Sequence, residues 1–173
     1  HVLPGRYALK GGLKAAGSAV EWLARELAGP GVPADGLPYA DLMAAAGPGV
    51  GRRVGPVWLP HLIGSGTPEG DRHSQAALVG HQAEHDRGDL FRALLEALAF
   101  WLRHNLAEMA DLTGQPAGQI ILLGGATRLG LLTQLKADIL HLPVAVPDIP
   151  ESSAVGAALL AGLGAGLFRT PGE

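Results

Sequence analysis

The hydrophobic positions along the chain repeat with the period of an α-helix in several segments. The clearest lies at residues 86–113, where leucines recur every three or four residues together with aromatic residues. Apolar residues cover too much of this helix for it to bury only one face, which predicts a central, packed helix. Shorter helices are predicted over residues 15–27 and 39–46, and an alanine- and glycine-rich helix over residues 152–167.

Short apolar runs between these segments predict strands. Residues 119–123 form a run that is too short for a helix and predicts a buried strand, followed by a helix over residues 129–140. Residues 7–9, 57–62 and 143–147 predict three further short strands. Strands that alternate with helices along a chain are typical of a layered α/β fold.

The predicted strand that ends at Leu123 is followed at once by Gly124, Gly125 and Ala126, just before a helix. Because glycine has no Cβ atom, a ligand can come close to the backbone there. The first turn of a helix also offers N–H groups and a partial positive charge to anionic groups. This arrangement favours a nucleotide site. The alternative is that the glycines only permit a tight turn between strand and helix.

Two common phosphate-binding motifs are absent from the sequence. No G-x-G-x-x-G follows a predicted strand, and the pattern G-x-x-x-x-G-K-[ST] does not occur. Gly162, Gly164 and Gly166 lie at the end of a predicted helix, where glycines are typical of helix packing and of C-caps. A phosphotransferase with this sequence therefore needs another architecture.

Other candidate sites are weaker. His81 and His85 have the i, i+4 spacing of two metal ligands, but the helix is predicted to begin only after them, which favours a surface or helix-entry role. Ser65 lies between two glycines without a buried strand before it, unlike a hydrolase nucleophile. Arg92 and Glu96 are best interpreted as an ion pair along the long helix. We therefore expect no metal site and no catalytic residue in this chain.

Composition narrows the class of protein further. The chain has 173 residues, of which 47% are hydrophobic and 17% charged, enough for one domain with a core. A net charge of −3 argues against nucleic acid as a partner. The absence of cysteine excludes a disulfide framework and a thiol nucleophile, and is compatible with a reducing cytosol. We expect no membrane span and no secretory signal, and a start without methionine suggests a piece of a longer protein.

Taken in order, these pieces resemble the C-terminal half of the FGGY family of carbohydrate kinases, from about residue 7 to residue 168. The resemblance rests on a series of matching residues, here called marks. Each mark is common by itself, but together and in this order they are specific. The marks are Gly17 with Trp22, residues 59–64 with Pro68 and Asp71, Gly80 with His85, residues 92–93 with Glu96, residues 124–126, Gln134 with residues 137–140, residues 143–144, Glu151, and residues 156–161.

The resemblance implies an RNase H-like (actin-like ATPase) domain, the second of two domains that close over a cleft. Residues 1–173 are expected to form one nucleotide-binding domain, without the N-terminal sugar-binding domain. The implied activity is transfer of a phosphoryl group from ATP, with Mg²⁺, to a hydroxyl of a sugar or polyol in the cytoplasm. The general-base aspartate of the family lies upstream, so this chain alone is expected to be inactive. A homodimer is the expected form of self-association, and neither nucleic acid nor a membrane is an expected partner.

The same resemblance implies a set of cofactor-binding residues. Phosphates are expected on the first helix and adenosine at the glycine turn, where Gly125 is expected within van der Waals distance of the ligand. The set consists of Gly17 and Glu21 on the phosphate side, Gly124, Gly125 and Ala126 on the adenosine side, and Arg128 and Leu129 directly after them.

Several positions depart from the family pattern. Gly66 stands where many members carry arginine, residues 75–76 replace Arg-Gly, Leu129 replaces a serine or asparagine, and Leu132 replaces a frequent tryptophan. Glu21, where some members have glutamine, would repel phosphates unless a magnesium ion or a rotamer change intervenes. These departures motivate an alternative: a degenerate, inactive family member that acts as a nucleotide-binding or regulatory module.

Overall fold

The structure is a computed structural model that describes residues 3, 5, 7–47, 55–149 and 151–170. Helices and short strands alternate along these residues, which confirms the expected α/β class. Within the described residues, none of the helices is both long and apolar enough to cross a membrane.

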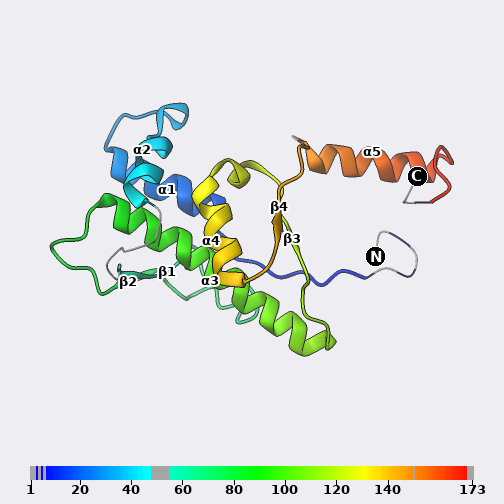
Figure 1. Cartoon of the computed structure of the whole chain (residues 1–173), viewed down its shortest axis with the longest axis horizontal. Helices are drawn as coiled ribbons and strands as arrows, with labels where there is room; N and C mark the ends of the chain where they lie inside the picture. The colour runs from blue at the N-terminus through cyan, green and yellow to red at the C-terminus, as the bar shows by residue number, and fades with distance from the viewer. Residues whose placement is uncertain (1–2, 4, 6, 48–54, 150, 171–173) are drawn as a thin grey trace.

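Four helices form the body of the molecule (Figure 1). They are α1 (Gly17–Ala28), α2 (Tyr39–Ala46), α3 (Arg87–Thr113) and α4 (Gly130–Leu140), and a short 3-10 helix, η1 (Ala34–Gly36), joins the first two. The long helix α3 contacts α1, α2 and α4, which confirms its predicted central position. The facing sides of these helices share one core, with buried side chains that include Leu23, Leu42, Phe91, Leu94 and Leu132.

Both ends of α3 follow from local sequence. The Asp86 side chain accepts hydrogen bonds from the N–H groups of Gly88 at 2.7 Å and Asp89 at 3.0 Å. In return, the Asp89 side chain accepts the N–H of Asp86 at 3.0 Å, which completes a capping box for the first turn. At the other end, Gly114 has the left-handed conformation, with φ 68°, that commonly ends a helix.

The strands form two small sheets. β1 (Val57–Leu59) pairs antiparallel with β2 (Ala77–Val79), with Trp58 opposite Leu78. β3 (Ile120–Ile121) pairs parallel with β4 (Val144–Ala145). The strand β2 is not predicted from the sequence, because three residues are too short a run to show a period.

Two strand predictions need correction. Residues 7–9 belong to no strand. A strand depends on hydrogen bonds to a neighbouring strand, and in the described residues β1 pairs with β2 and β3 with β4. The run at residues 119–123 forms a strand only at β3, and the prediction that it is buried is wrong, since Ile121 is 60% exposed. In the described residues β3 has a single neighbouring strand, β4.

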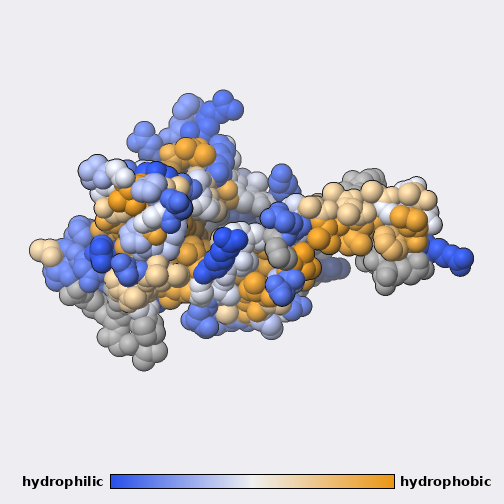
Figure 2. Space-filling model, turned by 90° about the horizontal axis from the view of Figure 1, so that it is seen from above, coloured by the Kyte–Doolittle hydropathy of each residue, from blue (hydrophilic) through white to orange (hydrophobic). Residues whose placement is uncertain are grey.

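The last helix, α5 (Ser152–Gly164), lies apart from α1 to α4 at the far end of the molecule (Figure 1). Figure 2 shows that the projecting end is largely hydrophobic on its surface. The predicted glycine cap is confirmed, because Gly166 has φ 74° and the N–H of Leu167 donates to the carbonyl of Gly162 at 2.8 Å. The predicted helix packing at Gly162 is wrong among the described residues, where this glycine packs against the ring of Phe168.

Candidate functional site

A cleft of about 730 Å³ opens between α1, α2, α3, α4 and the turn before α4. Glycine and alanine backbone lines part of it, and aliphatic and aromatic side chains from α2, α3 and α4 line most of the rest. The charged side chains of its described lining are Glu21, Arg128 and Lys136. The cleft therefore offers close backbone approach, apolar surface and positive charge in one place.

Most of the cofactor-binding residues predicted from the sequence line this cleft. The structure brings the α1 residues together with the turn that follows β3, although the two segments lie far apart in the chain. The lining includes Gly17, Glu21, Gly125, Ala126, Arg128 and Leu129. Gly124 lines a neighbouring pocket of about 370 Å³ at the ends of β3 and β4. That these residues bind a nucleotide stays a prediction.

The two glycines of the turn, Gly124 and Gly125, have different structural roles. Gly124 has φ 88°, which a residue with a side chain rarely adopts, and its carbonyl accepts the N–H of Thr127 at 3.1 Å and the Thr127 hydroxyl at 2.7 Å. A Cβ atom at Gly125 would meet no other atom within 4 Å, so that position borders open space. The turn explanation therefore holds for Gly124, whereas Gly125 leaves room inside the cleft.

The predicted turn between strand and helix contains a short 3-10 helix, η2 (Gly125–Arg128), between β3 and α4, which the sequence did not predict. The N–H of Leu129 donates to the carbonyl of Ala126 at 3.1 Å inside this turn. The tight turn changes the direction of the chain before α4 begins. It is this change of direction that brings Ala126 and Leu129 to the cleft.

On the opposite side, Gly17 begins α1 and Glu21 follows one turn later. A Cβ atom at Gly17 would meet nothing within 4 Å, so the helix start is open toward the cleft. The Glu21 carboxylate is not isolated, because it lies 2.7 Å from the guanidinium of Arg25. This ion pair offsets part of the negative charge that Glu21 brings to the cleft.

Sequence reasoning missed most of the other residues of the cleft, among them the ionisable side chains of Lys136 and Tyr39. Lys136 lines it from α4, and burial lowers the pKa of its ammonium group below the ordinary value. The i, i+3, i+7 spacing of Leu129, Leu132 and Lys136 puts all three on one helix face and is the signal that could have found it. Tyr39 lines the cleft from α2, and burial, followed by the charge of Glu21, raises its pKa.

The weaker candidates have structural explanations. His85 Nδ1 accepts the N–H of Gln82 at 2.9 Å, and the rings of His81 and His85 lie 5.6 Å apart. No group of three metal-ligating side chains is found among the described residues. The Ser65 hydroxyl is buried and accepts the N–H of Asp71 at 2.8 Å, which fixes a loop.

The residues of the cleft fit a nucleotide in their chemistry. Open backbone at Gly17 and Gly125 permits a close approach, and apolar side chains can pack against a base. Arg128 and Lys136 can balance phosphate charge. For a magnesium ion the described lining supplies one carboxylate, Glu21.

The chain matches known proteins along nearly its whole length. It fits the family model described as "FGGY family of carbohydrate kinases, C-terminal domain" over residues 1–165. It is 38% identical over 162 residues to the glycerol kinase of Gloeobacter violaceus, covering 94% of this chain and 31% of that protein. The chain thus spans about a third of the length of the curated relatives that it matches.

Solved structures of carbohydrate kinases are also similar to this chain. The xylulose kinase from Rhodospirillum rubrum is similar with 36% identity and a TM-score of 0.70, covering 86% of this chain and 29% of that one. The Plasmodium falciparum glycerol kinase with ADP shares the fold, with 24% identity and a TM-score of 0.70, covering 92% of this chain and 30% of that one.

These neighbours are sugar kinases with the actin-like ATPase fold, which confirms the expected fold class. The domain that matches is the C-terminal one, as the order of the motifs predicted. By both its sequence and its fold, this chain belongs to the FGGY family of carbohydrate kinases and corresponds to the family's C-terminal domain.

Proposed function

We propose that the full-length protein is an ATP-dependent carbohydrate kinase and that this chain supplies the nucleotide side of its active site. The observation that carries the proposal is the convergence of Gly17, Gly125 and Lys136 in one cleft, each from a different element. Membership of a carbohydrate kinase family supports phosphoryl transfer as the reaction. Catalysis of this reaction depends mainly on positioning the reactants and neutralising charge.

Each part of the cleft has a role in this proposal. Adenosine packs against the backbone of Gly125 and Ala126 and against Leu129, while Gly124 shapes the turn that presents them. The phosphates extend toward Gly17 and Glu21, and the cations Arg128 and Lys136 balance their charge. Mg²⁺ neutralises phosphate charge when it is bound, and a site with one protein carboxylate leaves most of its ligands to phosphate oxygens and water.

We place the acceptor hydroxyl and the general base outside this chain, in an N-terminal domain that precedes residues 1–173. Exposed apolar surface supports such a covering domain. Leu159 on α5 is 51% exposed, and Leu123 after β3 is 52% exposed. Helices that are apolar on all sides and parallel sheets are normally covered by other elements. The relatives are named glycerol and xylulose kinases, so the acceptor is a sugar or a polyol.

The test is ATP turnover by the full-length protein with a panel of polyols, pentuloses and hexuloses, measured as release of ADP. Phosphorylation of at least one compound is expected, together with a higher KM for ATP in Lys136→Met than in Lys10→Met. Lys10 is exposed and lies outside the cleft lining, so it serves as the matched control. A folded full-length protein that binds no ATP would overturn the nucleotide role of this chain.

The alternative is an inactive family member that binds nucleotide without transferring phosphate. Leu129 and the negative charge of Glu21 in the cleft favour it. The departure at Gly66 does not, because a Cβ atom there would overlap the carbonyl oxygen of Gly12, so glycine has a structural reason at this position. Retained ATP binding without turnover of any compound in the panel would favour this alternative.

The isolated chain of 173 residues is expected to fold around α1 to α4 without catalysing the reaction. It retains the shared core of these helices but holds only one side of the proposed active site. The assay is the same release of ADP with the purified chain. Measurable phosphorylation by this chain alone would contradict the proposed division of roles.

A further inference from the structure

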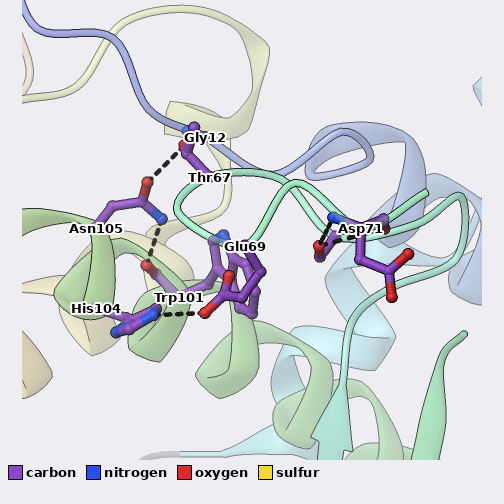
Figure 3. Close-up of polar contacts among 8 residues, drawn as sticks. Gly12, Thr67, Glu69, Asp71, Trp101, His104 and Asn105 are labelled. Carbon is purple, nitrogen blue, oxygen red and sulfur yellow. Dashed lines mark hydrogen bonds and ion pairs between the residues drawn. The ribbon is translucent and has the colours of Figure 1, made fainter. Parts of the chain in front are cut away.

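One wall of the cleft is formed where two stretches of backbone cross. Gly11 and Gly12, here called the glycine segment, meet Gly66 and Thr67. Figure 3 shows Gly12 and Thr67 next to Asn105 of α3. A Cβ atom at Gly66 would overlap the carbonyl of Gly12, and a Cβ atom at Gly11 would overlap the Asn105 side chain. The glycine segment therefore lies in direct contact with both neighbours, without room for a Cβ atom at Gly11 or Gly66.

Thr67 holds Gly12 by both of its backbone groups. The N–H of Gly12 donates to Thr67 Oγ1 at 2.6 Å, and the N–H of Thr67 donates to the carbonyl of Gly12 at 3.0 Å. Thr67 Oγ1 lies 2.9 Å from Asn105 Oδ1, and Asn105 Nδ2 donates to the carbonyl of Trp101 at 3.0 Å (Figure 3). We call this chain of bonds from Gly12 to Trp101 the relay.

The direction of the hydrogen bonds in the relay is determined by chemistry. The Trp101 carbonyl can only accept, so it must face the amide nitrogen of Asn105, which leaves Oδ1 toward Thr67. Because Oδ1 also only accepts, the Thr67 hydroxyl must donate to it, and a lone pair of Oγ1 accepts the N–H of Gly12. A single hydroxyl thus joins the glycine segment to the buried Asn105.

The loop that carries Thr67 is fixed on its far side as well. Glu69 Oε1 lies 2.9 Å from His104 Nε2 on α3 (Figure 3). The Ser65 hydroxyl accepts the N–H of Asp71 at 2.8 Å. The loop is therefore held to α3 by one contact besides Thr67, the Glu69–His104 pair, and closed on itself by the Ser65–Asp71 hydrogen bond. These contacts keep the Thr67 hydroxyl in place.

We propose that Thr67 and Asn105 are positioning residues of the cleft, which hold the glycine segment in the place where it meets the nucleotide. Gly11, Gly12 and Asn105 line the cleft, whereas Thr67 is absent from its lining and acts through Gly12. A wall that is ordered before the ligand arrives lowers the entropy cost of binding. This inference rests on the proposed function, because it assigns the cleft to ATP.

The test uses three substitutions in the full-length protein. Thr67→Val keeps the side-chain shape and removes the hydroxyl, and Thr67→Ser keeps the hydroxyl. Thr133→Val is the matched control, because the buried hydroxyl of Thr133 on α4 has no hydrogen-bond partner and the residue does not line the cleft. Amide hydrogen exchange at Gly12 and the Kd for ATP by calorimetry are measured for each.

We expect Thr67→Val to speed exchange at Gly12 and to raise the Kd for ATP, each about tenfold, as for the loss of a hydrogen bond. Thr67→Ser and Thr133→Val should stay within about twofold of wild type, since neither removes a bond of the relay. Rescue by serine separates the hydroxyl's role from packing. Where Thr67→Val does not fold, Thr67→Ala takes its place with the same expected changes.

The inference is wrong if Thr67→Val lowers thermal stability but matches Thr133→Val in both Gly12 exchange and ATP affinity. A wild-type protein that binds no ATP would instead overturn the proposed function, and with it the assignment of this wall to a nucleotide. Exchange at Gly12 would still decide whether Thr67 holds the glycine segment. The two failures are therefore distinguishable.

Discussion

Glu21 and Arg25 form a 2.7 Å ion pair one turn apart on α1, at the cleft that also contains Gly17 and Gly125. Both side chains are about half exposed, so solvent screens the pair and it stabilises the helix by only about 0.3–0.5 kcal/mol. The pair leaves Glu21 free to exchange partners at little cost in free energy. Its charge therefore affects a bound anion more than it affects the fold.

Replacing Glu21 by glutamine is expected to strengthen ATP binding by about threefold to tenfold, because a negative charge beside the phosphates is removed. Calorimetry measures the affinity, and thermal unfolding should change by less than the equivalent of about 0.5 kcal/mol. Glu26→Gln on the same helix is the control, since Glu26 lies outside the cleft lining. Equal affinities in the two variants would place the phosphates away from Glu21.

The two glycines of the turn should separate binding from folding. Gly125→Val is expected to weaken ATP binding by about 1–3 kcal/mol with little loss of stability, because its Cβ enters open space in the cleft. Gly124→Val should instead lower the free energy of unfolding by about 1–3 kcal/mol, because its φ of 88° disfavours a side chain.

Gly118→Val is the control for these two variants, since a Cβ atom there meets nothing within 4 Å and the residue lies outside the cleft. Calorimetry and thermal unfolding are measured on the same samples of full-length protein. If Gly125→Val loses stability yet keeps ATP affinity within about twofold of Gly118→Val, the glycine serves only the turn and the adenosine placement is wrong.

The protonation of Lys136 is expected to make both the stability of the protein and its affinity for ATP depend on pH. Burial lowers the pKa of Lys136, so the charged ammonium opposes folding in full below that lowered pKa, and the cost falls away as the pH rises from the lowered pKa to the ordinary lysine value. Phosphates favour the charged form, so ATP affinity should fall as the pH rises through the same range. Lys136→Met is expected to raise stability at pH 7, to weaken ATP binding about tenfold and to flatten the pH dependence.

Calorimetry across the alkaline range checks the prediction for Lys136, with Lys10→Met as the control that keeps the wild-type profile. Parallel pH profiles for wild type and Lys136→Met would show that the ammonium group does not face the phosphates. If Lys136→Met is less stable than wild type at pH 7, the claim that burial of the charged ammonium opposes folding is wrong.

Two phenylalanines on α3 are expected to contribute differently to the free energy of unfolding, because only one of them lies in the core. Phe91 is fully buried, whereas Phe100 is 52% exposed. In the chain of 173 residues, Phe91→Ala should lower the free energy of unfolding by about 3–5 kcal/mol and Phe100→Ala by about 1 kcal/mol or less. Urea unfolding measures both, and equal losses would mean that the core is not centred on Phe91.

Part of the candidate site followed from the sequence. The glycine turn was found because strand, small residues and helix follow one another within a few positions, and the start of α1 was implied by the resemblance to the family. Tyr39 was missed because nothing near it in the sequence relates it to that turn, whereas Lys136 was missed although its i, i+7 spacing from Leu129 carried a usable signal. Gly66, a departure from the family pattern, is explained only by its contact with Gly12 across the fold.

The sequence by itself determined the features that depend on neighbours along the chain. The capping box at Asp86, the left-handed Gly114 after α3 and the Gly166 cap after α5 all belong to this class. The long helix follows from its hydrophobic period, because side chains three and four residues apart share a face of a helix. Such interactions are complete within one or two turns and therefore appear directly in the order of residues.

Only the tertiary structure decided which distant segments meet. Residues 7–9 and 120–121 both have strand-like patterns, yet only residues 120–121 pair with another strand, β4. Even there, Ile121 remains exposed. The relay from Gly12 through Thr67 to Asn105 likewise joins three segments that share no local pattern. Contacts of this kind depend on how whole helices pack, because a period fixes which face of an element is apolar and leaves open what that face will meet.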